Sequence, residues 1–572
     1  MKLIIAEYLR TLRERDELDR LLPDLLVEMG YKLVARPQTG NRQYGVDIAA
    51  RGENDDGQEE LLLLVVKRGD IGSSEWDTKP QSVRQSINEI FDVYLRSHLE
   101  PRDEELPKHI VLVTNGELKQ TVLANWCGLV SEYEDKAKIE FWGIDTISSY
   151  VEEYLLDEHV FHDDDRHDLR RALALSGDSE YNRKDLHRIF RRALDLDEKG
   201  NLTEESKTGK NLLKAMRIVN LSAQIYANWS LLKDGDSRQG LLALERALLW
   251  SWHRIQLTDS NKDVVKGPFT SIWSSYTRYI PEYFSRLMPY YFTPNSLSRS
   301  PTYGGAETSL VAFEQIGFLA SFAVFMALQP ISPNQDSERE YWFQQLNSAC
   351  DALVAFIDNN GICTSPCLDS HSQDITLALF ALMLAGRIEF AQGWLKRLFR
   401  NIDYSYKSKN YVPIAIESLE DLPDEGGWLG DHASKRMMEM SWTLATIAGW
   451  CVILDLEDVY KALVEGATQD YPNTCIQLWH PEDDFYQHLY FRPAHFVSGV
   501  SQAPIELPPS IEEYKKQMMQ ILESDFAKAI SGSPAVKSRL LGLDFIAFRH
   551  FSTPVPPATW YGILRQENDL DS

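Results

Sequence analysis

The beginning of the chain alternates between two hydrophobic periods. In residues 17–31, ELDRLLPDLLVEMGY, apolar side chains recur at intervals of three and four, which predicts one face of a helix that ends at Gly30. Residues 31–37, 44–52 and 60–69 are shorter apolar segments, and their length is typical of strands. The acidic stretch ENDDGQE at 53–59 predicts a hairpin turn between the last two of them.

The same alternation continues to residue 157. Helical spacing returns at 81–99, a buried strand follows at 109–116, and a helix, a strand and a helix are predicted at 118–133, 138–145 and 146–156. Strands that alternate with helices in this way favour a layered α/β domain. We therefore expect residues 1–157 to form a small mixed sheet that is flanked by helices.

The pattern changes after residue 157. Residues 158–200 combine a charged linker with a basic helix, and residues 201–572 are dominated by long apolar helical patterns without regular strands. They include 210–232, 240–255, 309–328, 375–399 and 440–463. No fixed repeat period is present, so we expect a large, mostly α-helical region in one or two lobes that senses a trigger, binds a partner or assembles oligomers.

Composition narrows the class of protein. A chain of 572 residues is long enough for two or more domains with real cores. The net charge of −26 argues against a protein that coats DNA by bulk electrostatics, so any nucleic-acid contact must come from local basic patches. Six scattered cysteines are typical of a reducing compartment, and no apolar run is long enough to cross a bilayer. We expect a cytoplasmic protein that does not contact membranes.

The predicted hairpin carries the first candidate chemistry. Side chains alternate along a strand, so Val65 and Lys67 face the same way, and the neighbouring strand can bring Asp47 to that face. A carboxylate at Asp47 can bind Mg²⁺ or Mn²⁺, and the backbone carbonyl of Val66 is a second oxygen that suits such an ion. Lys67 can supply positive charge for phosphodiester hydrolysis. These three residues form our candidate catalytic and metal site.

The order of these segments resembles a known family. The motifs LDRLLPDLLVEMGY, GVDIAA, LLLLVVKRG, VRQSINEIF, HIVLVTNG and KIEFWGID follow one another as in the Mrr-type restriction endonuclease domain of the PD-(D/E)xK superfamily, over about the first quarter of the chain. This resemblance implies Mg²⁺-dependent DNA cleavage in restriction or antiviral defence. It also implies catalytic roles for Asp47 and Lys67, with assistance from Asp19 in the first helix.

One residue departs from the family pattern. Val65 stands where the family has Glu or Gln, and an isopropyl group cannot bind a cation. Glu59 and Glu60 are about 23–26 Å from Lys67 along the strand, at about 3.3 Å per residue. Replacement would have to come from Asp19 or from Gln81, Gln85 or Glu89. The alternative is a catalytically inactive nuclease fold that acts as a nucleic-acid-binding or protein-interaction scaffold.

Two further groups of residues have side chains that are typical of binding sites. Lys184, Arg188, Arg191 and Arg192 lie along one side of a predicted helix and form our candidate nucleic-acid contact. A solvated face that balances nearby acids is the competing interpretation. Cys363, Cys367 and His371 have zinc-ligand side chains, but structural zinc needs four ligands and a tighter spacing, so we do not expect a zinc site.

Together these features predict a Mg²⁺-dependent or Mn²⁺-dependent DNA endonuclease of restriction type with a helical regulatory region. Nucleases that cut both strands usually pair, so a homo-oligomer is expected. The helical region is expected to bind a protein or ligand activator. The inactive scaffold remains the alternative, and a plasmid cleavage assay with an Asp47→Ala control separates the two.

Overall fold

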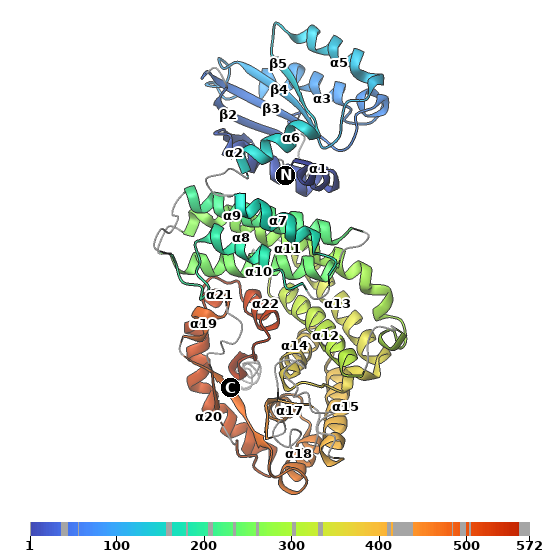
Figure 1. The fold of residues 1–572 in the computed structure, drawn as a ribbon, viewed down its shortest axis with the longest axis vertical. Coiled ribbons are helices and arrows are strands. Elements are labelled where there is room, and N and C mark those ends of the chain that lie inside the picture. Colours follow the sequence, from blue (N-terminus) through green and yellow to red (C-terminus); the bar gives the residue numbers. More distant parts are fainter. Residues whose placement is uncertain are drawn as a thin grey trace. The chain divides into compact units, whose positions relative to one another are not determined.

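The computed structural model describes fifteen segments of the chain, which are residues 2–35, 44–54, 57–155, 163–178, 181–203, 210–232, 236–258, 262–299, 305–329, 336–408, 413–415, 439–482, 484–491, 499–502 and 505–559. The predicted linker falls partly at 156–162, outside these residues. The described chain is 66% helical. It divides into two compact units. Figure 1 shows the chain with colours that follow the sequence.

The first unit contains a five-stranded mixed sheet. Its strands are β1 (Lys32–Ala35), β2 (Ile48–Glu53), β3 (Glu59–Lys67), β4 (Lys108–Thr114) and β5 (Lys138–Trp142), in the order β1-β2-β3-β4-β5. The pairs β1–β2 and β2–β3 are antiparallel, whereas β3–β4 and β4–β5 are parallel. This confirms the predicted mixed sheet and the hairpin between 48 and 67.

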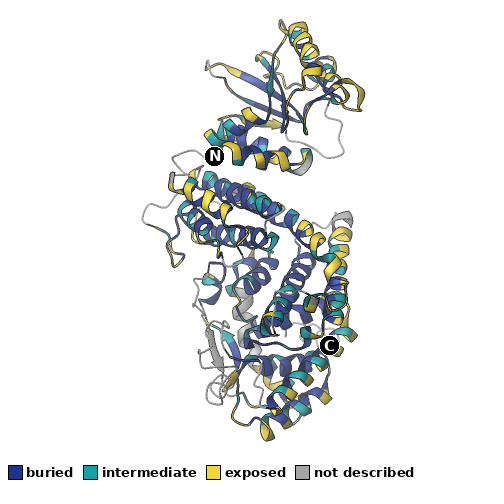
Figure 2. Cartoon of the chain, turned by 45° about the vertical axis from the view of Figure 1, so that its right-hand side comes forward, coloured by how far each residue is buried: buried dark blue, intermediate teal, exposed yellow. Residues whose placement is uncertain are grey.

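Helices cover both faces of this sheet. The helical elements of this region are α1 (Lys2–Thr11), η1 (Glu14–Leu18), α2 (Asp19–Glu28), η2 (Ser74–Thr78), α3 (Val83–Glu89), η3 (Ile90–Tyr94), α4 (Leu95–Ser97), α5 (Gln120–Tyr133), α6 (Ile144–Tyr150) and η4 (Val151–Leu155). Side chains of α3 and α5 pack with Leu61, Leu63 and Val65 in one apolar core. Figure 2 shows the buried strands in dark blue beside helices with exposed outer faces.

Further helices complete the first unit, which comprises residues 1–197, 202–251 and 258–277. They are α7 (Asp163–Ala174), α8 (Lys184–Leu194), α9 (Lys210–Ser230), most of α10 (Ser237–Gln256) and half of α11 (Lys262–Tyr291). The Tyr8 hydroxyl of α1 donates to Gln224 Oε1 of α9 at 2.8 Å. Arg217 of α9 pairs with Asp24 and Glu28 of α2. The boundary between the units therefore does not coincide with residue 157, where the sequence pattern changes.

The second unit comprises residues 198–201, 252–257 and 278–572. It confirms the prediction of a mostly helical region. Its helices are α12 (Gly305–Ala327), α13 (Asp336–Asn359), α14 (Ser372–Leu384), α15 (Ile388–Lys407), α17 (Trp442–Ile453), α18 (Glu457–Gln469), α19 (Phe485–His488), α20 (Ile511–Gly532), α21 (Pro534–Lys537) and α22 (Gly542–His550), with short helical turns η5 (Leu297–Arg299), η6 (Gly361–Thr364) and η7 (Asp369–His371). Two short strand pairs, β6 (Met440–Ser441) with β7 (Cys475–Ile476) and β8 (Leu478–Pro481) with β9 (Gly499–Gln502), join them.

Two of the predicted helices are broken in the structure. The pattern at 375–399 is divided between α14 and α15, and Gly386 with a φ of 70° lies between them. The pattern at 440–463 is divided between α17 and α18, where Asp455 has a φ of 51°. Residues in this left-handed conformation end a helix, and the apolar spacing continues across the break because both halves face the same core.

Helix α12 contradicts the prediction that no apolar segment is long enough to cross a bilayer. Its residues Ala306–Ala327 are long and apolar enough to cross a membrane by composition alone, so the apolar run is longer than predicted. However, 72% of its 18-residue apolar window is buried within the structure, where α12 packs against α13, α14 and α22. Such burial is typical of the core helix of a folded domain.

Candidate active site

Asp47 lies at the start of the predicted hairpin, directly before β2. Its backbone N–H donates to Leu64 O at 2.9 Å, and its side-chain Oδ2 accepts from the Val66 N–H at 2.7 Å. Leu64 is also the cross-strand partner of Ile48. The carboxylate of Asp47 therefore stands where the ladder between the two strands ends, and it is held against the backbone of β3.

Gly45 allows the chain to pass close to α3 just before the hairpin begins. Its φ is 85°, and a Cβ atom at this position would lie 2.0 Å from the carbonyl oxygen of Ser86 in α3. Any residue larger than glycine would push the segment away from α3. The Gly45-Val46-Asp47 order of the sequence thus has a structural cause, because the close approach brings Asp47 to the end of β3.

The hydrogen bond to Val66 also fixes the direction of the Val66 carbonyl. In a strand, the N–H and the C=O of one residue point to the same side, as when two residues of an antiparallel pair exchange both bonds. Because the Val66 N–H points at Asp47, its carbonyl is directed to the same side of β3. The Asp47 carboxylate and the Val66 carbonyl are therefore on the same side of β3.

Lys67 is the last residue of β3 and is half-buried. It pairs with Thr114 of β4 in the parallel register. Its ammonium group makes no hydrogen bond or ion pair with another residue in the described part of the chain. A half-buried cation one residue after Val66 is placed to meet an anion that approaches the end of the hairpin.

Asn115 anchors this end of the sheet, and the sequence interpretation missed it. Its Oδ1 accepts from the Gly69 N–H at 2.8 Å, and its Nδ2 donates to Leu9 O at 2.8 Å and to Leu12 O at 2.9 Å. The side chain is 2% exposed. It ties the segment after Lys67 to the end of α1. The Asn-Gly turn signal after β4 indicated a turn but not this role.

Val65 does not face an open metal site. Its side chain is 0% exposed and belongs to the apolar core that contains Val83 and Ile87 of α3. The position at which the resembled family has Glu or Gln is therefore occupied by core packing. Val65 thus contributes to a continuous apolar contact between β3 and α3.

The predicted replacements for this ligand are placed differently. Asp19 begins α2 and is half-buried, with α2 packed on β1 and β2. Gln81 and Gln85 are exposed, and Gln85 donates to Glu89 on its own helical segment at 3.1 Å. Within the described residues, no group of three or more His, Cys, Asp or Glu side chains could hold a metal ion. A hard ion here would bind to Asp47 and Val66 and complete its shell with water and phosphate oxygens, as Mg²⁺ commonly does.

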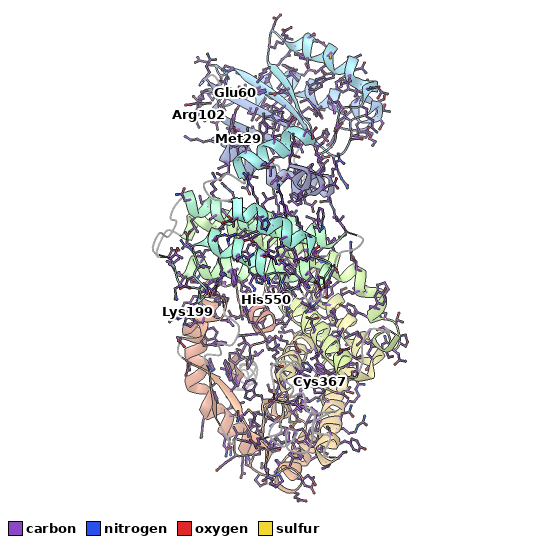
Figure 3. All side chains as sticks on the ribbon, in the orientation of Figure 1. Met29, Glu60, Arg102, Lys199, Cys367 and His550 are labelled. Atoms are coloured by element: carbon purple, nitrogen blue, oxygen red, sulfur yellow. The ribbon has the colours of Figure 1, made fainter. Side chains whose placement is uncertain are left out.

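A second polar cluster lies at the other end of the strands. His109 Nδ1 is 3.1 Å from Glu60 Oε1, and His109 Nε2 is 2.9 Å from Glu140 Oε2. Tyr31 also donates to Glu60 at 2.9 Å. Glu60, which is marked in Figure 3, is 4% exposed. The hydrogen bond with His109 lowers the pKa of Glu140 below its ordinary value. Glu60 therefore hydrogen-bonds within this cluster and is not a ligand for a metal ion beside Asp47.

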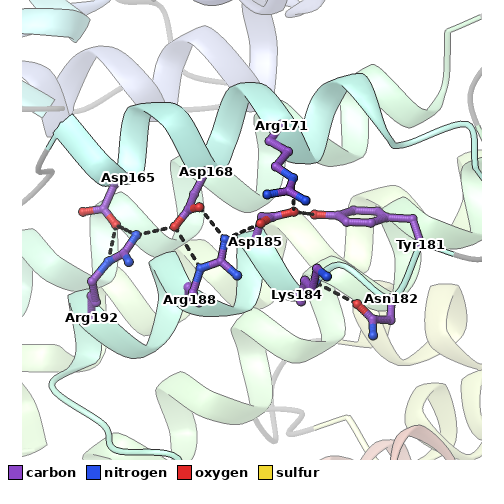
Figure 4. A network of polar contacts seen from close by, with 9 residues as sticks. All are labelled: Asp165, Asp168, Arg171, Tyr181, Asn182, Lys184, Asp185, Arg188 and Arg192. Carbon is purple, nitrogen blue, oxygen red and sulfur yellow. Dashed lines mark hydrogen bonds and ion pairs between the residues drawn. The ribbon is translucent and has the colours of Figure 1, made fainter.

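The predicted nucleic-acid stripe on α8 is largely neutralised. Figure 4 shows Arg188 and Arg192 facing the acids of α7. Arg188 Nη2 lies 2.5 Å from Asp168 Oδ1 and also binds Asp185, and Arg192 Nη2 lies 2.5 Å from Asp165 Oδ1 and 2.6 Å from Asp168 Oδ2. The hydrogen bond with Asp168 raises the pKa of Arg188 further above its ordinary value.

This network argues against phosphate binding by Arg188 and Arg192. Their charges are matched by carboxylates that are themselves buried, with Asp185 0% exposed and Asp165 2% exposed. Lys184 is exposed, and Arg191 is half-buried on the same helix. The competing interpretation of the sequence, a basic face that balances nearby acids, agrees better with these contacts.

In the described part of the chain, Cys363, Cys367 and His371 do not form a group that could hold a metal ion. The thiol of Cys363 is directed to Phe356 O at 3.9 Å, and the thiol of Cys367, which Figure 3 marks, to Ala306 O at 3.8 Å. The ring of His371 stacks on Phe313 at 4.5 Å, and burial lowers its pKa to about 3. These contacts are those of core residues.

Comparison of the chain with protein-family models, with curated proteins and with solved structures gave no match. The likeness to Mrr-type nucleases therefore rests on the sequence motifs alone.

Proposed function

We propose that the protein is a Mg²⁺-dependent DNA endonuclease of the Mrr type, with the reaction centre at the end of the hairpin formed by β2 and β3. The observation that carries this proposal is the contact of Asp47 Oδ2 with the Val66 N–H at 2.7 Å. It supports the proposal because a carboxylate meets the Val66 peptide, one residue before a lysine whose ammonium group has no partner in the described residues.

Each residue has a distinct role in this proposal. When bound, Mg²⁺ or Mn²⁺ would supply a Lewis acid for the phosphodiester and an activated water. Asp47 and the Val66 carbonyl hold the ion in place. Lys67 stabilises the negative charge that develops on the phosphoryl oxygens, or orients the attacking water. Asp19 assists from the beginning of α2, as the family resemblance implies.

The remaining parts of the proposal concern partners. The substrate is DNA, which is contacted locally because the net charge of −26 opposes broad electrostatic binding. Two copies pair so that both strands are cut. The helical regions sense a protein or ligand that activates cleavage, and the protein acts in the cytoplasm in restriction or defence.

Burial of Val65 supports a second candidate function. A site with one carboxylate and one carbonyl binds Mg²⁺ more weakly than a site with a second acid. A nuclease fold that has lost cleavage would then act as a scaffold for nucleic acid or for a protein partner. The two candidates differ in one measurable property, which is hydrolysis of a phosphodiester.

The test is cleavage of supercoiled plasmid by the full chain at several Mg²⁺ and Mn²⁺ concentrations. We expect nicked and linear DNA from the wild type, and a loss of rate of at least about 100-fold in Asp47→Ala and Lys67→Ala. Asp77→Asn and Lys79→Ala, which change exposed charges nearby, serve as matched controls and keep the rate. If Asp47→Ala and Lys67→Ala cleave as fast as the wild type, these residues are not catalytic. If no protein cleaves with either ion, the scaffold function is favoured.

A further inference from the structure

The chain leaves the sheet directly after Lys67 and turns at Gly69. Lys67 is the last residue of β3, and neither Arg68 nor Gly69 belongs to a helix or strand. Gly69 has a φ of 73°, a left-handed conformation that glycine adopts without steric cost. The orientation of the end of β3 therefore depends on the groups that bind Gly69.

Both backbone polar groups of Gly69 are bound by side chains at the end of β4. Asn115 Oδ1 accepts from the Gly69 N–H at 2.8 Å, and Thr114 Oγ1 donates to Gly69 O at 2.6 Å. Thr114 is 0% exposed and Asn115 is 2% exposed. Breaking a hydrogen bond of a buried group leaves that group without a partner, so these two bonds hold Gly69 firmly against β4.

Gly116 allows the two segments to touch. A Cβ atom at this position would lie 2.3 Å from the carbonyl carbon of Gly69 and 2.5 Å from the backbone nitrogen of Asp70. One step further along, the Ile71 N–H donates to Glu117 O at 2.9 Å. The chain just after β3 is thus held against the chain just after β4 by backbone atoms as well as by side chains.

The same Asn115 amide also binds α1. Its Nδ2 donates to Leu9 O at 2.8 Å and to Leu12 O at 2.9 Å. Carbonyl groups at the end of a helix lack partners within the helix, and here the amide of a distant residue supplies one. Helix α1 is itself held, because the Tyr8 hydroxyl donates to Gln224 of α9. Asn115 therefore joins the ends of β3, β4 and α1.

Only an amide of this length meets all of these requirements. It accepts one hydrogen bond and donates two from the same planar group. An aspartate would keep the acceptor for Gly69 but would direct a carboxylate oxygen at the carbonyl oxygens of Leu9 and Leu12. Because Asn115 is buried, its effect on a substrate has to pass through another residue. Lys67, two positions before Gly69, is that residue.

We propose that Asn115 is a positioning residue for the reaction at the end of the hairpin. By holding the chain directly after Lys67, it fixes the direction from which the lysine side chain reaches the substrate phosphate. Displacement of a catalytic group by about 1 Å can lower a rate about 100-fold, so rigidity at this point matters for catalysis. This inference rests on the proposed nuclease function.

The test compares plasmid cleavage by the full chain with and without the Asn115 amide, in Mg²⁺ and in Mn²⁺. In Asn115→Ala, the rate constant at saturating protein is expected to fall at least about tenfold. The protein concentration that gives half of the maximal rate should stay unchanged, because a buried amide does not touch DNA. In a Lys67→Ala background the same change should cost less than about twofold, since residues that act through one another are not additive.

Asn360→Ala is the matched control in the second unit. Asn360 is also 2% exposed, its Oδ1 accepts from the Leu297 N–H at 3.1 Å, and its Nδ2 donates to Phe356 O at 3.0 Å. This variant should lose stability in thermal unfolding but keep the cleavage rate. Thr114→Val is a milder second variant, which removes the bond to Gly69 O and should lower the rate at least about threefold. It replaces Asn115→Ala if thermal unfolding shows that the latter does not fold.

The outcomes distinguish the positioning role from the nuclease function. Absence of cleavage by the wild type refutes the nuclease function and the positioning role with it. Wild-type rates in every folded variant at positions 114 and 115 overturn the positioning role alone. So does an equally large fall in the Lys67→Ala background, or a loss of rate in Asn360→Ala as large as that in Asn115→Ala.

Discussion

The side-chain oxygen Oδ2 of Asp47 lies 2.7 Å from the backbone nitrogen of Val66 and accepts its hydrogen. The backbone of β3 thus holds the carboxylate at the point where the ladder between β2 and β3 ends. The two residues are close in sequence, so the hairpin alone brings them together. Val65, beside this contact, offers no ligand to a metal ion. The Mg²⁺ affinity of variants at position 65 therefore tests whether a metal binds here.

A carboxylate at position 65 should bind the ion that Asp47 binds. Val65 directly precedes Val66, whose N–H binds Asp47, but its side chain is packed in the apolar core against α3, so a glutamate at this position reaches the ion only by leaving that core. We expect Val65→Glu to destabilise the metal-free protein, because an acid then replaces a fully buried apolar side chain. We also expect Mg²⁺ to bind at least about tenfold more tightly, as measured by isothermal titration.

The control for this experiment is Leu63→Glu. Leu63 is also 0% exposed and belongs to the same apolar core, but it lies two residues further from Lys67. It should be destabilised to a similar degree without any gain in Mg²⁺ affinity. Equal Mg²⁺ binding by Val65→Glu and the wild type would contradict a metal site at the hairpin end.

The ion-pair network of α7 and α8 predicts acid sensitivity. Burial raises the pKa of Asp168, but hydrogen bonds from Arg188 and Arg192 outweigh it, so the pKa is lowered below 3.8. Stability from this group is therefore fully present above pH 3.8 and is lost as the pH falls through the lower folded-state pKa. Asp168→Asn should lose about 1–3 kcal/mol at pH 7 and less near pH 3 in urea unfolding. The exposed Asp164→Asn on the same helix is the control.

The same network predicts how replacement of Arg188 affects the salt dependence of DNA binding. An arginine that contacts phosphate contributes about one unit to the slope of log affinity against log salt. Because Arg188 is paired with Asp168 and Asp185, we expect Arg188→Gln to leave this slope unchanged. The measurement is fluorescence anisotropy of labelled duplex at several salt concentrations. A slope that falls by about one would restore the phosphate-contact interpretation of this helix.

His109 should stabilise the sheet mainly at neutral pH. Its replacement by Leu removes one hydrogen-bond partner from the buried Glu60 and one from Glu140. A loss of about 1–3 kcal/mol is expected in urea unfolding at pH 7. The pKa of Glu140 is lowered by His109, so this contribution is present above pH 4.5 and is lost as the pH falls through the folded-state pKa. The exposed His98→Leu should show no such pH-dependent loss; a constant deficit between pH 7 and pH 4 in His109→Leu would count against an electrostatic role.

The sequence by itself determined the alternation of strands and helices and the hairpin of β2 and β3. These features depend on side-chain period and on turns of a few residues, which act over short stretches of chain. The breaks at Gly386 and Asp455 escaped detection because the apolar spacing continues across them.

Only the tertiary structure decided which groups become partners. From sequence, Arg188 could be a phosphate contact or part of a basic face that balances nearby acids; packing of α7 on α8 brings Asp168 to it from twenty residues away. Asn115 likewise donates a hydrogen bond to Leu9 O in α1, more than one hundred residues away in the sequence. The partner of a polar side chain depends on how distant segments pack, and no periodic pattern along the chain encodes that packing.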